Sequence, residues 1–338
     1  MLPRERVIRA IEFNEPDRIP NGCYWLPAAN KNEAALRKIF ERYPKDFADI
    51  GYYFEHYQAY HEGTYRDKWG CVWKNTYDGI IGQVIEHPLE NATLEDIKNY
   101  EPPSPDEVLN FDTVEKNLSN PKIKEKYILG SIGNFFQRVF YLRGFEKTLL
   151  ELTLGRKEIS TLIEKVYKHV YELTRRWLEL DIDGLILLDD WGTNDRLFVR
   201  PEIWRKYFKK YYASIFAEIK KSGKHVFFHS DGYVVDIIPD LIEIGVDALN
   251  VQVALIGIDT LSRLCKGKIC ILADIDRQRL LPFGKPEEVK EHVKQIIRGL
   301  GLPTGGLIAW GEIGPDVPLE NVEAMLQAFF EYDIKSLR

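Results

Sequence analysis

The sequence has no long apolar segment and only four cysteines. Its longest apolar runs span about five residues, against the ~20 that a membrane helix needs, so we expect no association with a membrane. The cysteines, Cys23, Cys71, Cys265 and Cys270, are scattered and form no CxxC motif, which indicates reduced thiols and no disulfide framework. Residues 1–6 carry charge but no apolar core, so we expect no export signal and a cytoplasmic protein.

An excess of positive charge is also absent. The chain carries 46 Lys and Arg against 52 Asp and Glu, for a net charge of −6, which argues against a general nucleic-acid binder. Hydrophobic residues make up 45% and charged residues 29%, so disorder and coiled coil are excluded as the main state. A length of 338 residues fits either two domains or one α/β barrel with insertions.

The N-terminal part reads as an elaboration on a larger domain. Residues 3–13 have helical spacing, a turn follows at 14–17, and a strand is expected at 18–20. Residues 46–77 are rich in aromatic side chains, and alternation over 69–73 and 80–85 predicts a β-hairpin with its turn near 75–79. Because no second self-contained pattern precedes the proline-rich stretch 88–105, we expect one domain, 1–338, with residues 20–105 as an elaboration and cover.

After residue 127, short apolar runs alternate with longer amphipathic segments. The predicted strands are 127–130, 184–188, 225–228, 248–251, 269–273 and 306–309. The predicted helices are 145–154, 160–180, 201–221, 234–244, 286–300 and 319–332. With strand 18–20 and one more near the hairpin, the count reaches about eight, which predicts an α/β fold closed as a (β/α)8 TIM barrel. The alternative is an open doubly wound sheet, but no G-x-G-x-x-G joins a strand to a helix.

Polar residues follow six of these strands directly. In a barrel they converge on one mouth, where active sites of this architecture lie. A single acid after a strand often caps the next helix, but six consecutive cases favour a functional mouth. We expect catalytic roles for Asp190, His229 and Asp231. The candidate substrate-binding residues are Asn134, Asp189, Trp191, Asn250, Asp276, Arg277 and Gln278.

His229 and Asp231 form the sharpest motif. Alternation places both on one face of an extended segment, where an imidazole and a carboxylate can share a metal ion. A general acid/base role for His229 and a purely structural one remain open alternatives. Of the adjacent carboxylates Asp189 and Asp190, we expect one to face the mouth and the other to cap a helix or pair with an arginine.

Several motifs together resemble uroporphyrinogen decarboxylase-like proteins. They are residues 3–13 with 15–20, 190–193 (DWGT), 229–232 (HSDG), 276–278 (DRQ) with 281–284 (LPFG), and 315–322 (PDVPLENV). The resemblance runs from residue 3 to about 325 and implies a (β/α)8 barrel.

The family contains two chemistries. Uroporphyrinogen decarboxylases proper use no cofactor and surround the substrate carboxylates with an Arg-x-x-Gly-Arg motif, whereas residues 20–25 (PNGCYW) contain neither arginine. Cobamide-dependent methyltransferases of the family bind zinc through His-x-Cys-Gly and a later Cys. By this resemblance His229 matches the histidine, Asp231 replaces the first cysteine, and Glu312 is the nearest acceptor to the second. The implied metal set is His229, Asp231 and Glu312, holding Zn²⁺ or a harder divalent ion.

The sequence therefore leaves three candidate functions. The first is a methyltransferase-like enzyme with a metal at the barrel mouth, acting on a small molecule and working with a corrinoid protein. The second is a metal-free decarboxylase for a tetrapyrrole or carboxylated aromatic, using Asp190 and His229 to handle protons. The third is a non-catalytic ligand-binding barrel. We further expect the cavity to be acidic and to be partly covered by Trp25, Trp69 and Trp73. The protein is expected to be a monomer or a homodimer.

Overall fold

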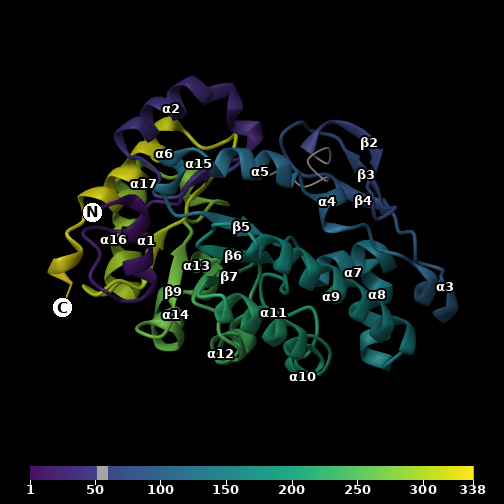
Figure 1. The fold of residues 1–338 in the computed structure, drawn as a ribbon. Coiled ribbons are helices and arrows are strands. Elements are labelled where there is room, and N and C mark those ends of the chain that lie inside the picture. Colours follow the sequence, from purple (N-terminus) through teal and green to yellow (C-terminus); the bar gives the residue numbers. More distant parts are fainter. Residues whose placement is uncertain (52–59, 338) are drawn as a thin grey trace.

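The computed structural model describes residues 1–51 and 60–337, and a six-stranded parallel sheet lies at its centre (Figure 1). Its strands, in spatial order, are β5 (Leu129–Ser131), β6 (Gly184–Leu188), β7 (His225–Ser230), β8 (Ala248–Val251), β9 (Cys270–Ala273) and β10 (Leu307–Ala309). Neighbours in the sheet are consecutive among these six strands, as expected when helices connect parallel strands. The six predicted strands are confirmed, with boundaries within two residues.

Helices connect these strands and cover the outside of the sheet. They are α7 (Phe136–Arg143), α8 (Phe145–Leu154), α9 (Lys157–Leu178), α10 (Pro201–Trp204), α11 (Lys210–Lys221), α12 (Ile238–Glu243), α13 (Val253–Ile256), α14 (Ile258–Cys265), α15 (Leu280–Phe283), α16 (Pro286–Leu300) and α17 (Leu319–Glu331). A π-helical turn, Arg205–Lys209, joins α10 to α11. Helix α9 buries Leu162, Val166, His169 and Leu173 along one stripe, because these positions recur every three to four residues. Helical periodicity therefore located the long helices correctly.

At the β10 edge, the sheet is bonded to the N-terminal segment. Ala309 donates its N–H to the carbonyl of Pro20 at 2.9 Å and accepts the N–H of Gly22 at 2.8 Å. Beyond it, β1 (Tyr24–Trp25) pairs in parallel with β11 (Glu312–Ile313). The first strand was predicted at 18–20, but pairing begins only at Pro20, and the carbonyl of Ile19 instead accepts a hydrogen bond from the side chain of Arg18 at 2.8 Å.

At the β5 edge, a second short segment is bonded to the sheet. Tyr127 donates its N–H to the carbonyl of Asp46 and accepts the N–H of Ala48, both at 2.9 Å. Asp46 in turn donates its N–H to the carbonyl of Asn21 at 2.8 Å. The two edges are thus connected through residues 20–25 and 46–48, which we had assigned to the elaboration. The further strand expected near the hairpin does not join the central sheet, since the hairpin strands form a separate sheet, and the segment bonded to the β5 edge is 46–48.

The remaining N-terminal elements lie above the sheet and to its right in Figure 1. They are the 3₁₀ helix Pro27–Asn32, α2 (Glu33–Arg42), α3 (Leu94–Asn99), α4 (Pro105–Val108), α5 (Phe111–Leu118), α6 (Pro121–Lys124) and an antiparallel sheet of β2 (Gly63–Arg66), β3 (Val72–Asn75) and β4 (Gln83–Glu86). The predicted hairpin is confirmed as β3–β4. The additional strand β2 is mostly exposed and so lacks the alternation that would have revealed it. Four aromatic residues of the stretch 46–77 lie outside the described residues: Tyr52, Tyr53, Phe54 and Tyr57.

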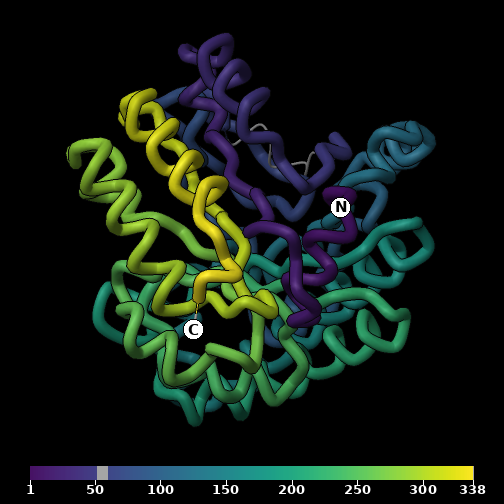
Figure 2. The backbone as a smooth tube through the Cα atoms, turned by 90° about the vertical axis from the view of Figure 1, so that its left-hand side faces the viewer, coloured from purple at the N-terminus to yellow at the C-terminus, as the bar shows by residue number. Residues whose placement is uncertain are grey.

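Two hydrophobic clusters hold the fold together. The larger one fills the space between strands and helices. The smaller one lies on the other face of the strands and includes Ile186, Phe227 and Ile308, with Val7 and Ile11 of α1 (Pro3–Ile11) packed against them. Figure 2 shows α1 and the C-terminal helices on the same side of the molecule. Each strand therefore buries both of its faces, which explains why the strands read as continuous apolar runs.

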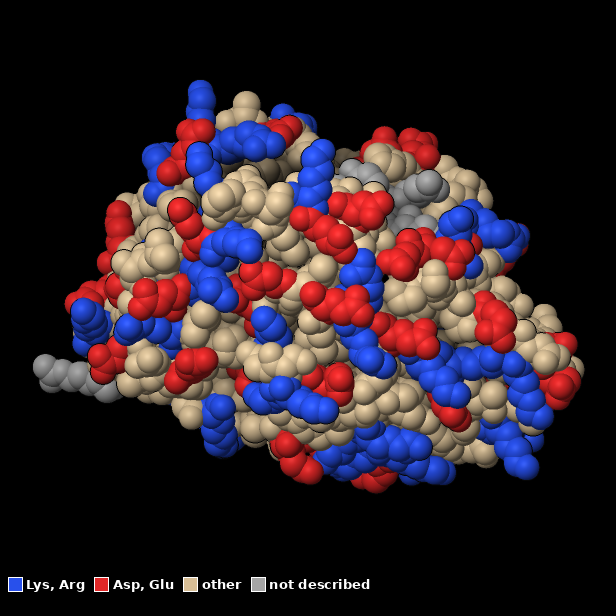
Figure 3. Space-filling model, in the orientation of Figure 1, with Lys and Arg blue, Asp and Glu red and all other residues tan. Residues whose placement is uncertain are grey.

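The surface carries charge of both signs. Figure 3 shows Lys and Arg interspersed with Asp and Glu over the face drawn there. Among the described residues, no helix combines the length and hydrophobicity that a membrane crossing requires. All four cysteines are free and buried, and burial raises the pKa of the Cys23 and Cys265 thiols to about 12.

Candidate active site

A cavity of about 680 Å³ lies at the carboxyl ends of the central strands. The predicted site residues that line it are Asn134, Asp190, His229, Asp231, Asn250, Arg277 and Glu312. They come from elements far apart in the sequence, and parallel strands bring their ends to one edge. A cavity of this size suits a small-molecule ligand.

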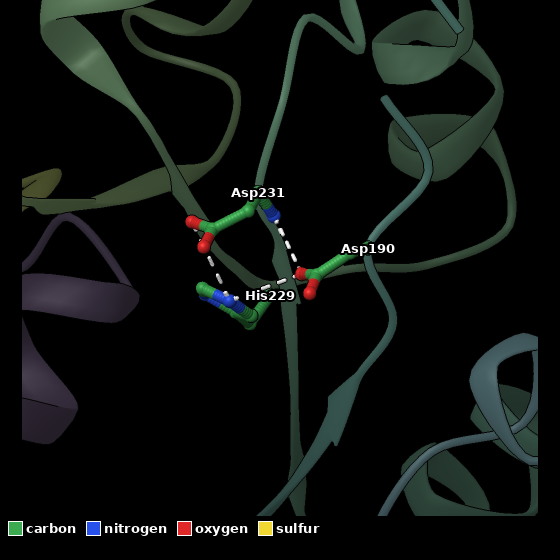
Figure 4. Close-up of side chains that lie close together, drawn as sticks. All are labelled: Asp190, His229 and Asp231. Carbon is green, nitrogen blue, oxygen red and sulfur yellow. Dashed lines mark hydrogen bonds and ion pairs between the residues drawn. The ribbon is translucent and has the colours of Figure 1, made fainter. Parts of the chain in front are cut away.

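His229 ends β7 and has a fixed orientation. Its Nδ1 lies 2.5 Å from Oδ1 of Asn250, and the side-chain amide of Asn250 donates to the carbonyl of Leu272 at 3.0 Å. Because that second bond fixes which end of the amide is oxygen, Nδ1 of His229 must be the donor. The other nitrogen, Nε2, therefore points into the cavity toward Asp190 and Asp231 (Figure 4).

Two carboxylates face Nε2 of His229. Oδ1 of Asp190 lies 3.5 Å from it and Oδ1 of Asp231 lies 3.8 Å from it. Burial alone would lower the pKa of His229, but the hydrogen bond to Asp190 and the charges of Asp231 and Asp190 outweigh it and raise this pKa to about 9. Without a bound metal, the imidazole is therefore protonated at neutral pH.

Each carboxylate is held by its own partners. The backbone N–H of Asp231 donates to Oδ1 of Asp190 at 2.9 Å, and the amide of Gln137 donates to Oδ2 of Asp190 at 3.1 Å. Arg277 donates to Oδ2 of Asp231 and lies 3.2 Å from Oε1 of Glu312. These contacts leave the Oδ1 atom of Asp231 directed at His229, so the two carboxylates are oriented before any ligand arrives.

A close approach of two loops sets the spacing of these carboxylates. The loop after β6 carries Asp190 and the loop after β7 carries Asp231, and they meet at Gly192 and Gly232. Gly232 has φ of +87°, and a Cβ built on it would lie 2.1 Å from the carbonyl oxygen of Gly192. Only glycine fits there, which explains the glycine in each motif.

Three side chains have the geometry of a metal site. Asp190, His229 and Asp231 each offer one ligand atom, and these atoms lie within 4.8 Å of one another. Their chemistry fits a divalent ion, since one imidazole nitrogen and two carboxylate oxygens are common ligands of first-row metals. The cluster differs from the predicted set, because Glu312 instead pairs with Arg277 and accepts a hydrogen bond from the hydroxyl of Tyr24 at 2.8 Å.

Asp189 and Trp191 flank Asp190 but do not line the cavity. The carboxylate of Asp189 is fully buried and accepts the backbone N–H groups at the start of α7, together with the hydroxyl of Tyr212. As predicted for the pair, one carboxylate caps a helix while Asp190 faces the cavity. Trp191 is buried and stacks on Phe136 with ring centroids 3.8 Å apart. Both were expected to bind substrate, and their burial places them behind the cavity wall.

Asp276 and Gln278 also lie outside the cavity lining. Asp276 accepts the backbone N–H groups of Gln278 and Arg279, so its carboxylate closes the turn before α15. Gln278 is exposed. Of the three neighbours only Arg277 lines the cavity, so the expectation that all three contact substrate is not met by the geometry.

The predicted tryptophan cover is wrong. Trp69 and Trp73 are buried against the hairpin and α7, where Trp73 donates to Asp67, and Trp25 packs on Phe40. None of the three lines the cavity. The aromatic residues that do are Tyr24, Phe47, Tyr60, Tyr141 and Trp310.

Sequence reasoning also missed polar residues of the lining. Gln137, which holds Asp190, sits one turn into α7, and Lys45 precedes the short segment 46–48. Neither directly follows one of the predicted strands, so the rule that located the other residues could not find them. With Lys45 included, the described lining has four carboxylates against three cations once His229 is protonated, and its predicted acidic character is slight.

Comparison with known proteins identifies the family of this chain. A family model described as Uroporphyrinogen decarboxylase (URO-D) matches residues 75–332. Uroporphyrinogen decarboxylases from two strains of Coxiella burnetii are each 22% identical over 271 residues, which cover 76% of this chain and 72% of the relative. A methyltransferase from Methanosarcina mazei has a TM-score of 0.74 at 14% identity, covering 97% of this chain and 98% of its own, which shows a shared fold. Because the family model spans most of the sequence, the chain belongs to the uroporphyrinogen decarboxylase family and is an enzyme of that superfamily.

Proposed function

We propose that this enzyme transfers a methyl group between a small molecule and a corrinoid protein, using a divalent metal held by Asp190, His229 and Asp231. The observation that carries the proposal is the cluster itself, whose three ligand atoms lie within 4.8 Å of one another at the cavity wall. Three protein ligands are typical of a catalytic metal site, which keeps a position for the substrate.

The surrounding residues support a ligand role for each member. Asn250 holds the Nδ1–H of His229, so that Nε2 is the nitrogen offered to the cavity. Gln137 and Arg277 hold the second oxygens of Asp190 and Asp231. When bound, the ion would act as a Lewis acid that lowers the pKa of a substrate heteroatom. Binding requires His229 to lose its proton, since a protonated imidazole has no lone pair for a metal.

We infer that the fold of this enzyme is a (β/α)8 barrel. Hydrogen bonds through residues 20–25 and 46–48 connect the two edges of the six-stranded sheet, which supports a ring of eight segments. The small cluster of apolar side chains would then be the barrel interior. The cavity would lie at its carboxyl-terminal mouth.

A second candidate is decarboxylation without a metal. It is favoured by the pKa of about 9 for His229, because a protonated imidazole beside the cavity can donate a proton to the carbanion that loss of CO₂ leaves. The binding of a polycarboxylate such as uroporphyrinogen is disfavoured, because Arg277 is already paired with Asp231 and Glu312.

Metal titration by calorimetry tests the first proposal. We expect chelator-treated protein to bind one Zn²⁺ or Mn²⁺ per chain, and Asn250→Ala to weaken binding by about tenfold to a hundredfold. His229→Ala and Asp190→Asn should weaken it further. The matched control is Glu312→Gln, which alters a cavity carboxylate outside the cluster and should keep the affinity.

Activity separates the two candidates. Methylated donors are incubated with cob(I)alamin, and formation of methylcobalamin is followed by absorbance before and after metal removal. Loss of this activity with the metal supports methyl transfer. Release of CO₂ from uroporphyrinogen that persists in chelator, or equal Zn²⁺ binding by wild type and His229→Ala, would contradict it. The predicted monomer or homodimer is measured by light scattering.

A further inference from the structure

Lys45 is the cation of the cavity that the proposed chemistry does not use. It precedes the segment 46–48, and its side chain lines the same cavity as His229. The ammonium nitrogen lies 4.8 Å from the ring centre of Trp25 and 5.0 Å from that of Phe40. These rings hold the charged end in place without neutralising it, because a ring face carries only a partial negative charge.

No carboxylate lies within ion-pair distance of Lys45 in the part of the chain that the structure describes. Burial lowers the pKa of its ammonium group; the nearby Cys23 and Asp49 oppose this shift, and the charge of Lys126 adds to it. Arg277, the other permanent cation of the lining, differs because it is shared between Asp231 and Glu312. Asp49 also lines the cavity but forms no ion pair with Lys45, so an anion that enters can still pair with this ammonium group.

The neighbouring walls are aromatic. Phe47 and Trp310 have ring centroids 5.2 Å apart at 81°, and both line the cavity. Gly22 lies under Trp310, where an added Cβ would come within 2.3 Å of the indole ring. Such surfaces favour a planar apolar group, which gains from ring stacking as well as from leaving water.

We propose that Lys45 binds the carboxylate of a substrate with an aromatic body, and so selects aromatic acids. In the sheet, β5 and β6 separate the segment of Lys45 from β7, which carries His229, so the two residues come from different sides of the cavity. A carboxylate on Lys45 would leave the far end of the ring free to reach the cluster of Asp190, His229 and Asp231. That this acid is a methyl donor rests on the proposed function, whereas its recognition by Lys45 does not.

The test is a binding experiment with two probes that differ only in charge. Quenching of tryptophan fluorescence is titrated with 4-methoxybenzoate and with the neutral 4-methoxybenzamide. We expect wild type to bind the acid about tenfold to a hundredfold more tightly, as a hydrogen bond between charged groups provides. Lys45→Met should abolish this preference, and Lys45→Arg should restore most of it.

The matched control is Lys126→Met. It removes a nearby positive charge that does not line the cavity, so it should keep the preference for the acid. Equal binding of acid and amide by wild type, binding of neither, or an unchanged preference in Lys45→Met would overturn the proposal. If the preference depends on Lys45 but no methyl transfer occurs, the proposed function fails while the assignment of Lys45 stands.

Discussion

The protonation of His229 makes a prediction about stability that needs no substrate. In chelator-treated protein, its imidazole has a pKa of about 9, against 6.5 for an unfolded chain. At pH values between these two pKa values, the native state therefore keeps a proton on His229 that the unfolded state has lost. Replacing His229 with glutamine removes this titration and keeps a side chain that can still donate a hydrogen bond.

The size and sign of the effect follow from the two pKa values. Each unit of difference corresponds to about 1.4 kcal/mol, so protonation of His229 contributes about 3 kcal/mol to the free energy of unfolding. Because the folded pKa is the higher one, this contribution is fully present below pH 6.5. It declines as the pH rises from 6.5 and is lost above about pH 9.

Urea unfolding at several pH values between 6 and 9.5 measures the effect. Relative to His229→Gln, wild type should lose about 3 kcal/mol across this range. The substitution His61→Gln, at an exposed histidine, controls for the loss of an imidazole elsewhere. Parallel pH profiles for wild type and His229→Gln, or an NMR titration of His229 with a pKa at or below 6.5, would refute the reasoning.

Three further predictions concern the supports of the site. Asp189→Ala leaves several buried donors unsatisfied, so chemical denaturation should show a loss of about 3 kcal/mol or more; an unchanged midpoint would mean that water replaces the carboxylate. Arg138→Met strands the buried carboxylate of Asp67 and should cost about 3–5 kcal/mol in thermal unfolding, most of it recovered by adding Asp67→Asn. Gly232→Ala drives a methyl group into the carbonyl of Gly192, so calorimetry should find weaker Zn²⁺ binding than wild type; full affinity would show that the loops can separate.

The central strands and long helices were predictable because burial leaves a local pattern. The segments 184–188 and 248–251 match β6 and β8 at both ends, and 145–154 and 286–300 match α8 and α16. Each carries its own apolar run or helical stripe, so no knowledge of distant residues is needed. Most of the cavity lining was found for a related reason, since polar residues after parallel strands meet at one edge.

The elements that failed prediction depend on distant partners. The segments 20–25 and 46–48 are too short to show alternation, and their place beside the sheet follows from backbone pairing with Ala309, β11 and Tyr127. Which carboxylate lies beside His229 depends on side chains from other elements. Arg277 forms an ion pair with Glu312, while Gln137 donates a hydrogen bond to Asp190. The spacing of residues along the sequence does not predict which of these side chains pair.

The pairing of β1 with β11 has a consequence for how the enzyme is made. Tyr24 lies opposite Glu312 across this pair, so residues 288 positions apart must meet before the cavity is complete. Contacts of such high sequence separation form late, because closing a long loop costs entropy before any interaction is gained. During synthesis, the partner strand becomes available only after nearly the whole chain has been made. We therefore expect ribosome-bound chains that end before residue 307 to build much of the sheet but to bind no substrate, so that substrate binding reports the synthesis of β10 and β11.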